Sequence, residues 1–275
     1  MSTRRRLDLE LVRRQLVSGR TVAREMIGAG RVTVDGAPAT KASRMVSAGE
    51  AVVVKGPPQR FVSRGGRKLE AALAGFGLDP DGMRAIDVGS STGGFTDCLL
   101  QHGAASVVAL DVGRGQLHQR LRVDLRVDVH ERTNVRGIDG ASVGAPFDLL
   151  VSDLSFISLR TVMADLVGLV PDGAPLVLLV KPQFEAGKAE VDRGSGVIRD
   201  RAVWEQVLIE VERSVRAHGA AIIGGMASPI TGADGNVEFL LHVVAGAAGT
   251  TPIGVFDPTA LVASASSSVA DGAGA

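Results

Sequence analysis

One glycine-rich segment constrains the fold of this chain more than any other feature. The apolar run 85–88 leads into Gly89-Ser-Ser-Thr-Gly93-Gly94, and residues 95–100 then carry apolar side chains at helical spacing. Glycine accepts positive φ and allows a ligand close to the backbone, and the first N–H groups of the next helix face the same point. The segment therefore predicts a strand, a turn and a helix that together bind a nucleotide-like cofactor.

The spacing within and after this segment indicates which cofactor is expected. The loop lacks the G-x-G-x-x-G spacing of dinucleotide-binding proteins, and an acidic residue, Asp87, precedes its first glycine. A second predicted strand, 105–111, ends in Asp111, where Rossmann-type folds place the group that binds ribose hydroxyls. Together these features resemble motifs I and II of the S-adenosylmethionine-dependent methyltransferases. The alternative is an ordinary tight turn with a surface carboxylate. The resemblance implies S-adenosyl-L-methionine as cofactor, bound by Asp87, Gly89, Ser90, Thr92, Gly93, Gly94, Asp111 and Asn134.

Charge is distributed unevenly along the 275 residues, although the formal net charge is zero. Residues 1–68 contain 15 Lys or Arg against 5 Asp or Glu, whereas the remainder contains 15 against 25. A basic N-terminal region is expected to bind a polyanion, and a merely solvated charged surface is the alternative. The single cysteine, Cys98, excludes an internal disulfide and a cysteine-rich metal site. With no long apolar run, we expect a cytoplasmic protein that does not contact membranes.

The first 55 residues predict two helices followed by a small hairpin. Helical spacing begins at Arg6 and again at Thr21, and strands are predicted at 31–36 and 50–54. This order resembles the S4 RNA-binding domain. The resemblance makes basic residues the expected RNA contacts, and because no aromatic residue precedes Phe61, we expect recognition of RNA shape rather than base stacking. The alternative is a basic helical hairpin that docks protein. The candidate RNA contacts are Arg4, Arg6, Arg20, Lys41 and Arg64.

Four charged residues in the remaining chain fall at the ends of predicted elements. Lys68 begins the predicted helix 69–76, Asp153 and Lys181 end two apolar strands, and Glu238 opens the last strand. In a parallel α/β sheet ligands bind at the carboxyl ends of the strands, so we expect these side chains to meet at one rim. Two lysines and two carboxylates can tune a lysine into a general base. The alternative is that each lysine simply reaches solvent.

The K-D-K-E order resembles the FtsJ/RrmJ-like 2′-O-ribose methyltransferases. With residues 62–69, 88–97, 152–159 and 180–185, and the S4-like region ahead, the chain is similar to the TlyA (haemolysin A) family. The resemblance implies an α/β Rossmann-like class I methyltransferase fold, with a mostly parallel seven-stranded sheet and a small N-terminal α+β domain. It also implies 2′-O-methylation of cytidine in 16S and/or 23S ribosomal RNA, with catalytic Lys68, Asp153, Lys181 and Glu238. Separately, the sequence has no His/Asp/Glu cluster that suggests a metal, so we expect no metal, and we expect a monomer. The alternatives are a non-catalytic RNA-binding ribosome-assembly factor and a membrane-lytic haemolysin, for which no suitable apolar span is present.

The predicted domain division follows from these resemblances and from composition. We expect an S4-like domain at 1–56, a linker at 57–62 that contains Pro57-Pro58, and a methyltransferase domain at 63–246. The polar, glycine-rich segment 187–198 is expected to be a mobile loop. Residues 247–275 are rich in Ala, Gly, Ser and Thr and are expected to be a disordered tail.

Overall fold

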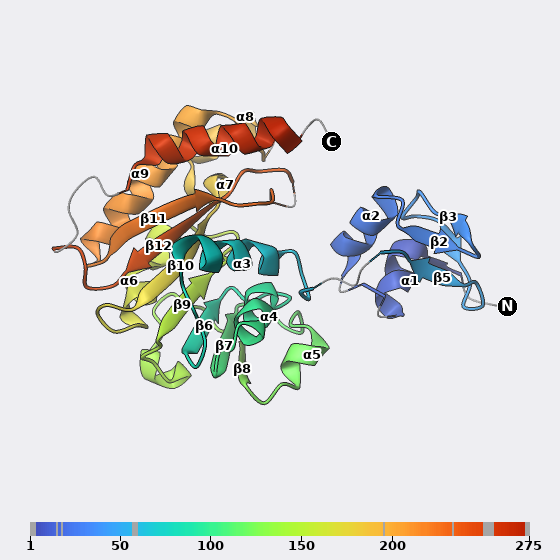
Figure 1. Ribbon diagram of the computed structural model, residues 1–275, viewed down its shortest axis with the longest axis horizontal. Coiled ribbons are helices and arrows are strands. Elements are labelled where there is room, and N and C mark those ends of the chain that lie inside the picture. The colour runs from blue at the N-terminus through green and yellow to red at the C-terminus, as the bar shows by residue number, and fades with distance from the viewer. Residues whose placement is uncertain are drawn as a thin grey trace. The chain divides into compact units, whose positions relative to one another are not determined.

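The computed structural model describes all residues except 1–3, 15, 18, 57–59, 195, 233, 250–255 and 273–275. The chain forms two compact units, Met1–Ser63 and Arg64–Ala275, which we describe separately (Figure 1). The predicted linker lies next to this boundary, but residues 57–59 of it fall outside the described part of the chain. None of the helices in the described residues is long and apolar enough to span a bilayer.

Unit 1 consists of two helices packed on short antiparallel strands. The elements are β1 (Arg5–Arg6), α1 (Leu7–Arg13), α2 (Arg20–Gly28), β2 (Val32–Val34), β3 (Ala37–Pro38), β4 (Met45–Val46) and β5 (Val52–Val54). Strand β2 pairs with β3 and β5, and β1 pairs with β4. The apolar faces of the helices and of β2 close over a small core that contains Leu7, Leu11, Ile27 and Val32. The predicted two helices and hairpin are present.

Unit 2 is built on one seven-stranded sheet. Its strands are β6 (Arg84–Val88), β7 (Ser106–Asp111), β8 (Val127–Glu131), β9 (Leu149–Ser152), β10 (Pro175–Val180), β11 (Ala221–Ala227) and β12 (Phe239–Val244). Their spatial order is β11-β12-β10-β9-β6-β7-β8. The five strands from β8 to β10 run parallel, and β12 runs antiparallel to both of its neighbours. This arrangement confirms the predicted mostly parallel seven-stranded sheet.

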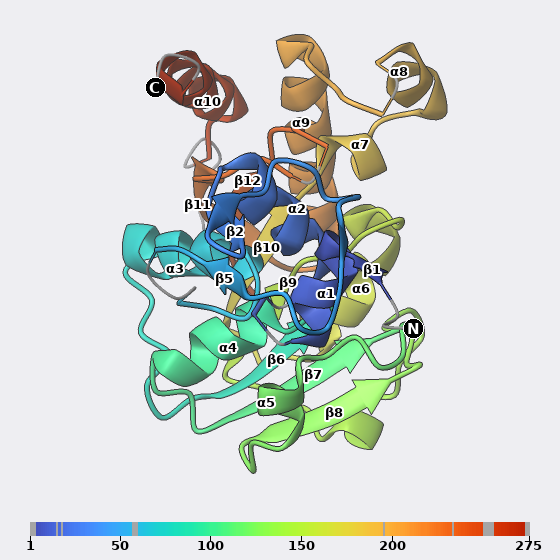
Figure 2. The same cartoon turned by 90° about the vertical axis from the view of Figure 1, so that its right-hand side faces the viewer.

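Helices cover both faces of this sheet (Figures 1 and 2). The helices are α3 (Gly65–Phe76), α4 (Gly94–Gln101), α5 (Gln119–Arg122), α6 (Leu159–Gly168), α7 (Pro182–Glu185), α8 (Lys188–Arg193), α9 (Arg201–Ala217) and α10 (Pro258–Gly272), with a 3₁₀ turn at Gly140–Val143. Helices α3 and α4 pack against each other, whereas α6, α9 and α10 share one large core with the sheet. The central strands are therefore buried on both sides, as their continuous apolar runs require.

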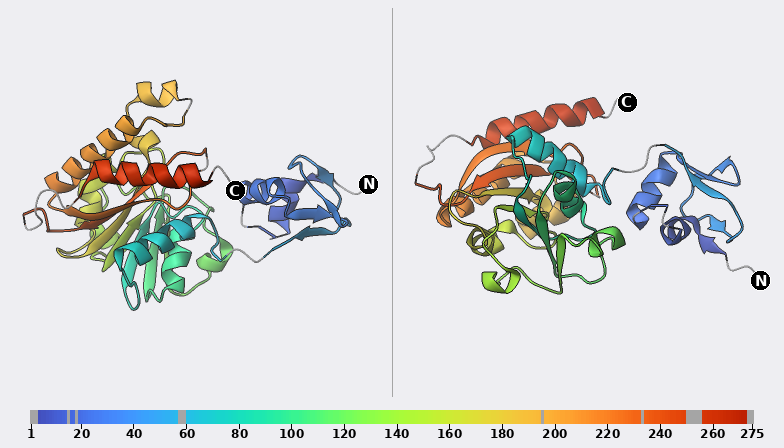
Figure 3. Two further views of the ribbon diagram at one scale, coloured as in Figure 1. Left: turned by 45° about the horizontal axis from the view of Figure 1, so that its top comes forward. Right: turned by 60° about the horizontal axis from the view of Figure 1, so that its bottom comes forward.

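Two predictions about irregular segments are wrong. The segment 187–198 contains helix α8, and the tail expected to be disordered contains helix α10. Helix α10 packs against α9 and β11 (Figure 3), and Leu261, Val262 and Ala265 on it are buried. The small residues of the tail suggest disorder by composition, but apolar side chains at helical spacing supply enough buried surface to order the helix.

Candidate functional site

Strand register brings the predicted catalytic residues to one edge of the unit 2 sheet. Val88 pairs with Ser152 and Ser152 with Leu178, so the chain leaves β6, β9 and β10 at the same rim. Because β12 is antiparallel, its first residue, Phe239, pairs with Val180 at the end of β10. Lys181 and Glu238 are the next residues outward on these two strands. They therefore lie side by side although one ends a strand and the other precedes one.

The glycine-rich loop lies at the same rim, after β6. Gly89 and Gly93 have φ of 88° and 95°, and Ser91 between them also has a positive φ of 46°. A Cβ atom on Gly89 would lie 2.8 Å from the carbonyl oxygen of Asp153, and one on Gly93 would lie 2.2 Å from Leu121. Glycine is thus required at both positions by conformation and by space. Gly93 is the N-cap of α4, so the N-terminus of this helix directly follows the loop.

Asp87 lies beneath this loop and is fully buried. Its Oδ2 accepts hydrogen bonds from the Thr96 backbone N–H at 2.9 Å and the Thr96 hydroxyl at 2.6 Å. Its Oδ1 is buried and has no hydrogen-bond partner in the described part of the chain. The pKa of Asp87 is raised to about 7, mainly by burial; the Asp153 and Asp111 carboxylates act in the same direction, and the hydrogen bonds from Thr96 oppose them. An orphaned buried carboxylate oxygen under a glycine loop indicates a group that is satisfied by a ligand.

Asp111 organises the loops at the end of β7. Its Oδ2 accepts from the N–H of Ser91 at 2.8 Å, and its Oδ1 accepts from the N–H of Gly113 at 2.6 Å. Helix α5, which lies beside β8 (Figure 2), closes this side of the loop, because Leu121 on it contacts Gly93. Asp111 thus joins the glycine loop to the segment that follows β7. Asn134, predicted to bind cofactor, is exposed after β8, and its Oδ1 accepts from the Arg136 N–H.

The four predicted catalytic residues form two ion pairs at the rim. Lys68 on α3 pairs with Glu238, and both side chains are buried. Lys181 Nζ lies 2.6 Å from Asp153 Oδ1. The sequence suggested that Lys68 begins a helix, but α3 already starts at Gly65, so the lysine side chain reaches inward from the first turn. Burial raises the pKa of Glu238, and the nearby Asp153 carboxylate acts in the same direction. The ammonium groups of Lys68 and Lys181 oppose this rise.

Two further side chains, Ser155 and Glu185, contact the predicted site or the segment beside it, and neither was assigned a role from the sequence. Lys181 Nζ donates a hydrogen bond to Ser155 Oγ at 2.8 Å. Glu185 on α7 is buried and accepts from Ser158 Oγ at 2.5 Å and from the Leu159 N–H at 2.7 Å. Glu185 therefore fixes the segment 153–158 at the start of α6. The serines in this segment were the available signal, but their partners lie 26 and 27 residues away.

The predicted RNA-binding residues are found in both units. Arg4, Arg6, Arg20 and Lys41 lie in unit 1, whereas Arg64 is the N-cap of α3 in unit 2. Arg6 and Arg20 both bind one buried carboxylate, that of Asp8. Arg4 Nη2 lies 4.0 Å from Glu50 Oε2, and Lys41 is exposed.

Comparison with known proteins supports the division into units. A model of the FtsJ-like methyltransferase family matches residues 61–244, and a model of the S4 domain matches residues 5–52. The chain is 49% identical over 242 residues to the 16S/23S rRNA (cytidine-2′-O)-methyltransferase TlyA of Mycobacterium tuberculosis, covering 88% of this chain and 90% of that protein. It is 38% identical over 241 residues to Hemolysin A of Brachyspira hyodysenteriae, covering 87% and 99%. A solved hemolysin-type protein from Streptococcus thermophilus superposes with a TM-score of 0.80 at 36% identity, covering 99% of each chain.

Proposed function

This chain belongs to the FtsJ-like methyltransferase family and to its TlyA group, and from that premise we propose that it methylates the ribose 2′-hydroxyl of a cytidine in ribosomal RNA, using S-adenosyl-L-methionine. The observation that carries the proposal is the pair of lysine–carboxylate contacts, Lys181 with Asp153 and Lys68 with Glu238, at the rim that holds the glycine loop. The resemblance seen in the sequence is confirmed by the family match over both units.

The residues around the glycine loop fit S-adenosylmethionine. The loop offers backbone N–H groups and two positions that only glycine fills, Asp111 supplies a carboxylate for ribose hydroxyls, and Asp87 has a buried oxygen without a partner. When bound, the cofactor supplies an electrophilic methyl group on a sulfonium. Gly89, Gly93, Asp87 and Asp111 would hold it, and Asp153 borders the loop through its contact with Gly89.

Lys181 is the proposed base. Methyl transfer would form a bond between the 2′-oxygen and the methyl carbon and break the carbon–sulfur bond, leaving a neutral thioether, while the hydroxyl proton would pass to the unprotonated amine of Lys181. Asp153 at 2.6 Å stabilises the ammonium that forms, and Ser155 at 2.8 Å fixes its orientation. Two of the three directions around Nζ are then defined by protein groups, which leaves the third for the ribose oxygen. The Lys68–Glu238 pair lies at the same rim, carries no net charge, and makes no hydrogen bond to Lys181 Nζ among the described residues.

Unit 1 is proposed to bind the RNA. Residues 1–63 contain 12 Lys or Arg against 5 Asp or Glu, and S4 domains recognise structured RNA by shape. A 2′-hydroxyl is chemically the same in every nucleotide, so the choice of target must come from contacts outside the reacting atoms.

The proposal is tested by transfer of labelled methyl from S-adenosylmethionine to purified small and large ribosomal subunits. We expect label in RNA with the wild-type protein and a loss of at least about a hundredfold with Lys181→Ala. Calorimetric cofactor binding, unchanged in the variant, is the control for folding. Cofactor binding without label on either subunit would reject the enzymatic proposal and favour an RNA-binding assembly role.

A further inference from the structure

Asp8 lies in the first turn of α1 and is completely buried, yet it is surrounded by arginines. Arg6 donates to it twice, through Nε to Oδ1 at 3.0 Å and through Nη2 to Oδ2 at 3.1 Å. Arg20 Nη2 donates to Oδ2 at 3.2 Å, and Arg24 Nε lies 3.6 Å from the same oxygen. One buried carboxylate therefore contacts three guanidinium groups from two elements.

The charges at this point favour an external anion. The Arg6 hydrogen bond, assisted by Arg20, lowers the pKa of Asp8 to about 2, so the carboxylate stays ionised at neutral pH. Three guanidiniums and one carboxylate leave a local excess of two positive charges. The side chains of Arg6, Arg20 and Arg24 are 40%, 51% and 58% exposed. A guanidinium has five N–H donors; Arg6 uses two on Asp8, Arg20 uses one, and Arg24 forms only an ion pair with it, so donors remain for a second acceptor.

The origin of the three side chains explains why they lie together. Arg6 directly precedes α1, and Arg20 and Arg24 are one turn apart on α2, on the same helix face. Without a central anion, three guanidiniums this close would repel one another and separate. Asp8 therefore does more than neutralise charge, because it holds the arginines in one arrangement before any ligand arrives.

We propose that Asp8 is a positioning residue that presents Arg6, Arg20 and Arg24 as one binding surface for the phosphodiester backbone of structured RNA. This inference rests on the proposed function and adds two residues, Asp8 and Arg24, to those that the sequence nominates. A rigid set of bidentate donors matches phosphate geometry, and Arg suits this role better than Lys. Asp8 itself touches no RNA.

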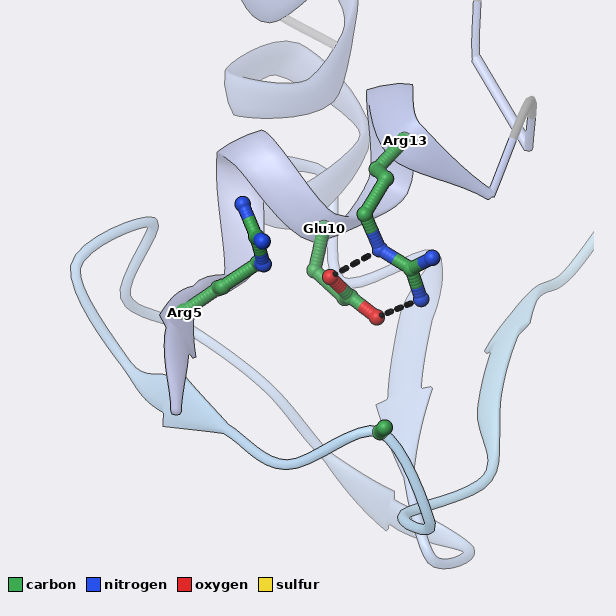
Figure 4. Close-up of a pocket in the computed structure, with 4 residues that line it drawn as sticks. Arg5, Glu10 and Arg13 are labelled. Atoms are coloured by element: carbon green, nitrogen blue, oxygen red, sulfur yellow. Dashed lines mark hydrogen bonds and ion pairs between the residues drawn. The ribbon is translucent and has the colours of Figure 1, made fainter. Parts of the chain in front are cut away.

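Glu10 offers a matched control on the same helix. It is also buried, and it binds Arg13 at 2.6 and 2.8 Å (Figure 4) and Arg14 at 2.8 Å. Arg14, however, also donates to the carbonyl oxygens of Glu50, Ser47 and Ala48. Glu10 therefore joins Arg14 to the interior of unit 1, while its other partner, Arg13, is 51% exposed. A Glu10→Gln substitution removes a buried carboxylate from α1 but leaves the Asp8 surface intact.

The test measures the Kd for purified ribosomal subunits, together with KM and kcat for methyl transfer, in Asp8→Asn, Arg24→Ala and Glu10→Gln. For Asp8→Asn we expect Kd and KM to rise about tenfold with kcat within about twofold, and for Arg24→Ala a rise of about fivefold. Glu10→Gln should change Kd by less than about threefold. Arg24→Ala leaves Asp8 paired with Arg6 and Arg20, so it reports on the surface even where Asp8→Asn does not fold.

The sign of the Asp8→Asn effect separates positioning from simple electrostatics. The substitution adds one net positive charge, so a surface that acts only through charge would bind RNA more tightly. Tighter binding, an unchanged Kd for Arg24→Ala, or an equal loss in Glu10→Gln would each overturn the inference. Wild-type protein that binds subunits but transfers no methyl would instead reject the proposed function, and the Kd comparison would still decide the role of Asp8.

Discussion

At the residue scale, substitutions of Lys181 can separate its role as a base from its role as a positive charge. Lys181→Arg keeps a positive charge opposite Asp153 and Ser155 but cannot accept a proton, because the guanidinium stays protonated. We expect kcat for methyl transfer to fall by about 10² to 10⁴, with the Kd for S-adenosylmethionine within about twofold. For Asp153→Asn we expect a smaller fall in kcat, since this substitution weakens only the stabilisation of the Lys181 ammonium. Activity of Lys181→Arg within tenfold of wild type would show that charge alone is needed.

The raised pKa of Asp87 predicts that the stability of unit 2 depends on pH. Because burial raises its pKa to about 7, between pH 4 and 7 the folded state keeps a proton that the unfolded state has released. The free energy of unfolding of unit 2 should therefore fall as pH rises through this window, by about 1.4 kcal/mol per pH unit from this group, and level off above pH 7. Asp87→Asn should remove that slope.

The only tryptophan, Trp204, is buried in unit 2, so its fluorescence during urea unfolding reports on this unit. The measurement compares wild type with Asp87→Asn from pH 4.5 to 8 without cofactor. Thr96→Val, which removes the hydroxyl donor to Asp87, is the control and should keep the slope. Parallel profiles for wild type and Asp87→Asn would contradict the raised pKa.

At the scale of elements, Glu185 joins two segments that follow different strands. It caps the start of α6 and holds Ser158, and Arg160 Nε lies 3.3 Å from its Oε2. We expect Glu185→Ala to release the segment 153–158, lowering kcat about tenfold to a hundredfold while the Kd for cofactor changes by less than about threefold. Glu210→Ala is the control, since Glu210 also pairs with Arg160 but does not contact this segment. Equal losses in both variants would assign the effect to Arg160 instead.

The positions of some site residues could be predicted from the sequence, whereas others depend on how the elements pack. The strand ends Asp111, Asp153 and Lys181 were predictable because continuous apolar runs mark buried strands and parallel strands share one rim. Glu238 was predictable only as the start of a strand, and its position beside Lys181 depends on the antiparallel pairing of β12 with β10. The contacts of Ser155 and Glu185 depend on packing between segments distant in sequence, which no local pattern encodes. Helix α10 was missed because its composition resembles that of a linker.

At the scale of the whole molecule, the N-terminal region and the rest of the chain carry opposite net charges. Residues 1–68 carry an excess of ten basic residues, and the rest carries an equal acidic excess. If the basic region binds RNA phosphates and the glycine loop binds cofactor, salt should affect the two ligands differently. We expect the KM for ribosomal subunits to rise about 10² to 10³ between 50 and 200 mM KCl, with the Kd for S-adenosylmethionine within about twofold.

The double-logarithmic slope of subunit Kd against salt counts the phosphates that the protein neutralises. Arg20→Ala should reduce this slope by about one, whereas Arg126→Ala, in unit 2 and paired with Asp124, should leave it unchanged. Magnesium is held constant throughout, because loss of Mg²⁺ would unfold the RNA rather than weaken the contact. A subunit KM that does not depend on salt would mean that recognition rests on the acidic unit 2 instead, and the basic region would then have to serve a different polyanion.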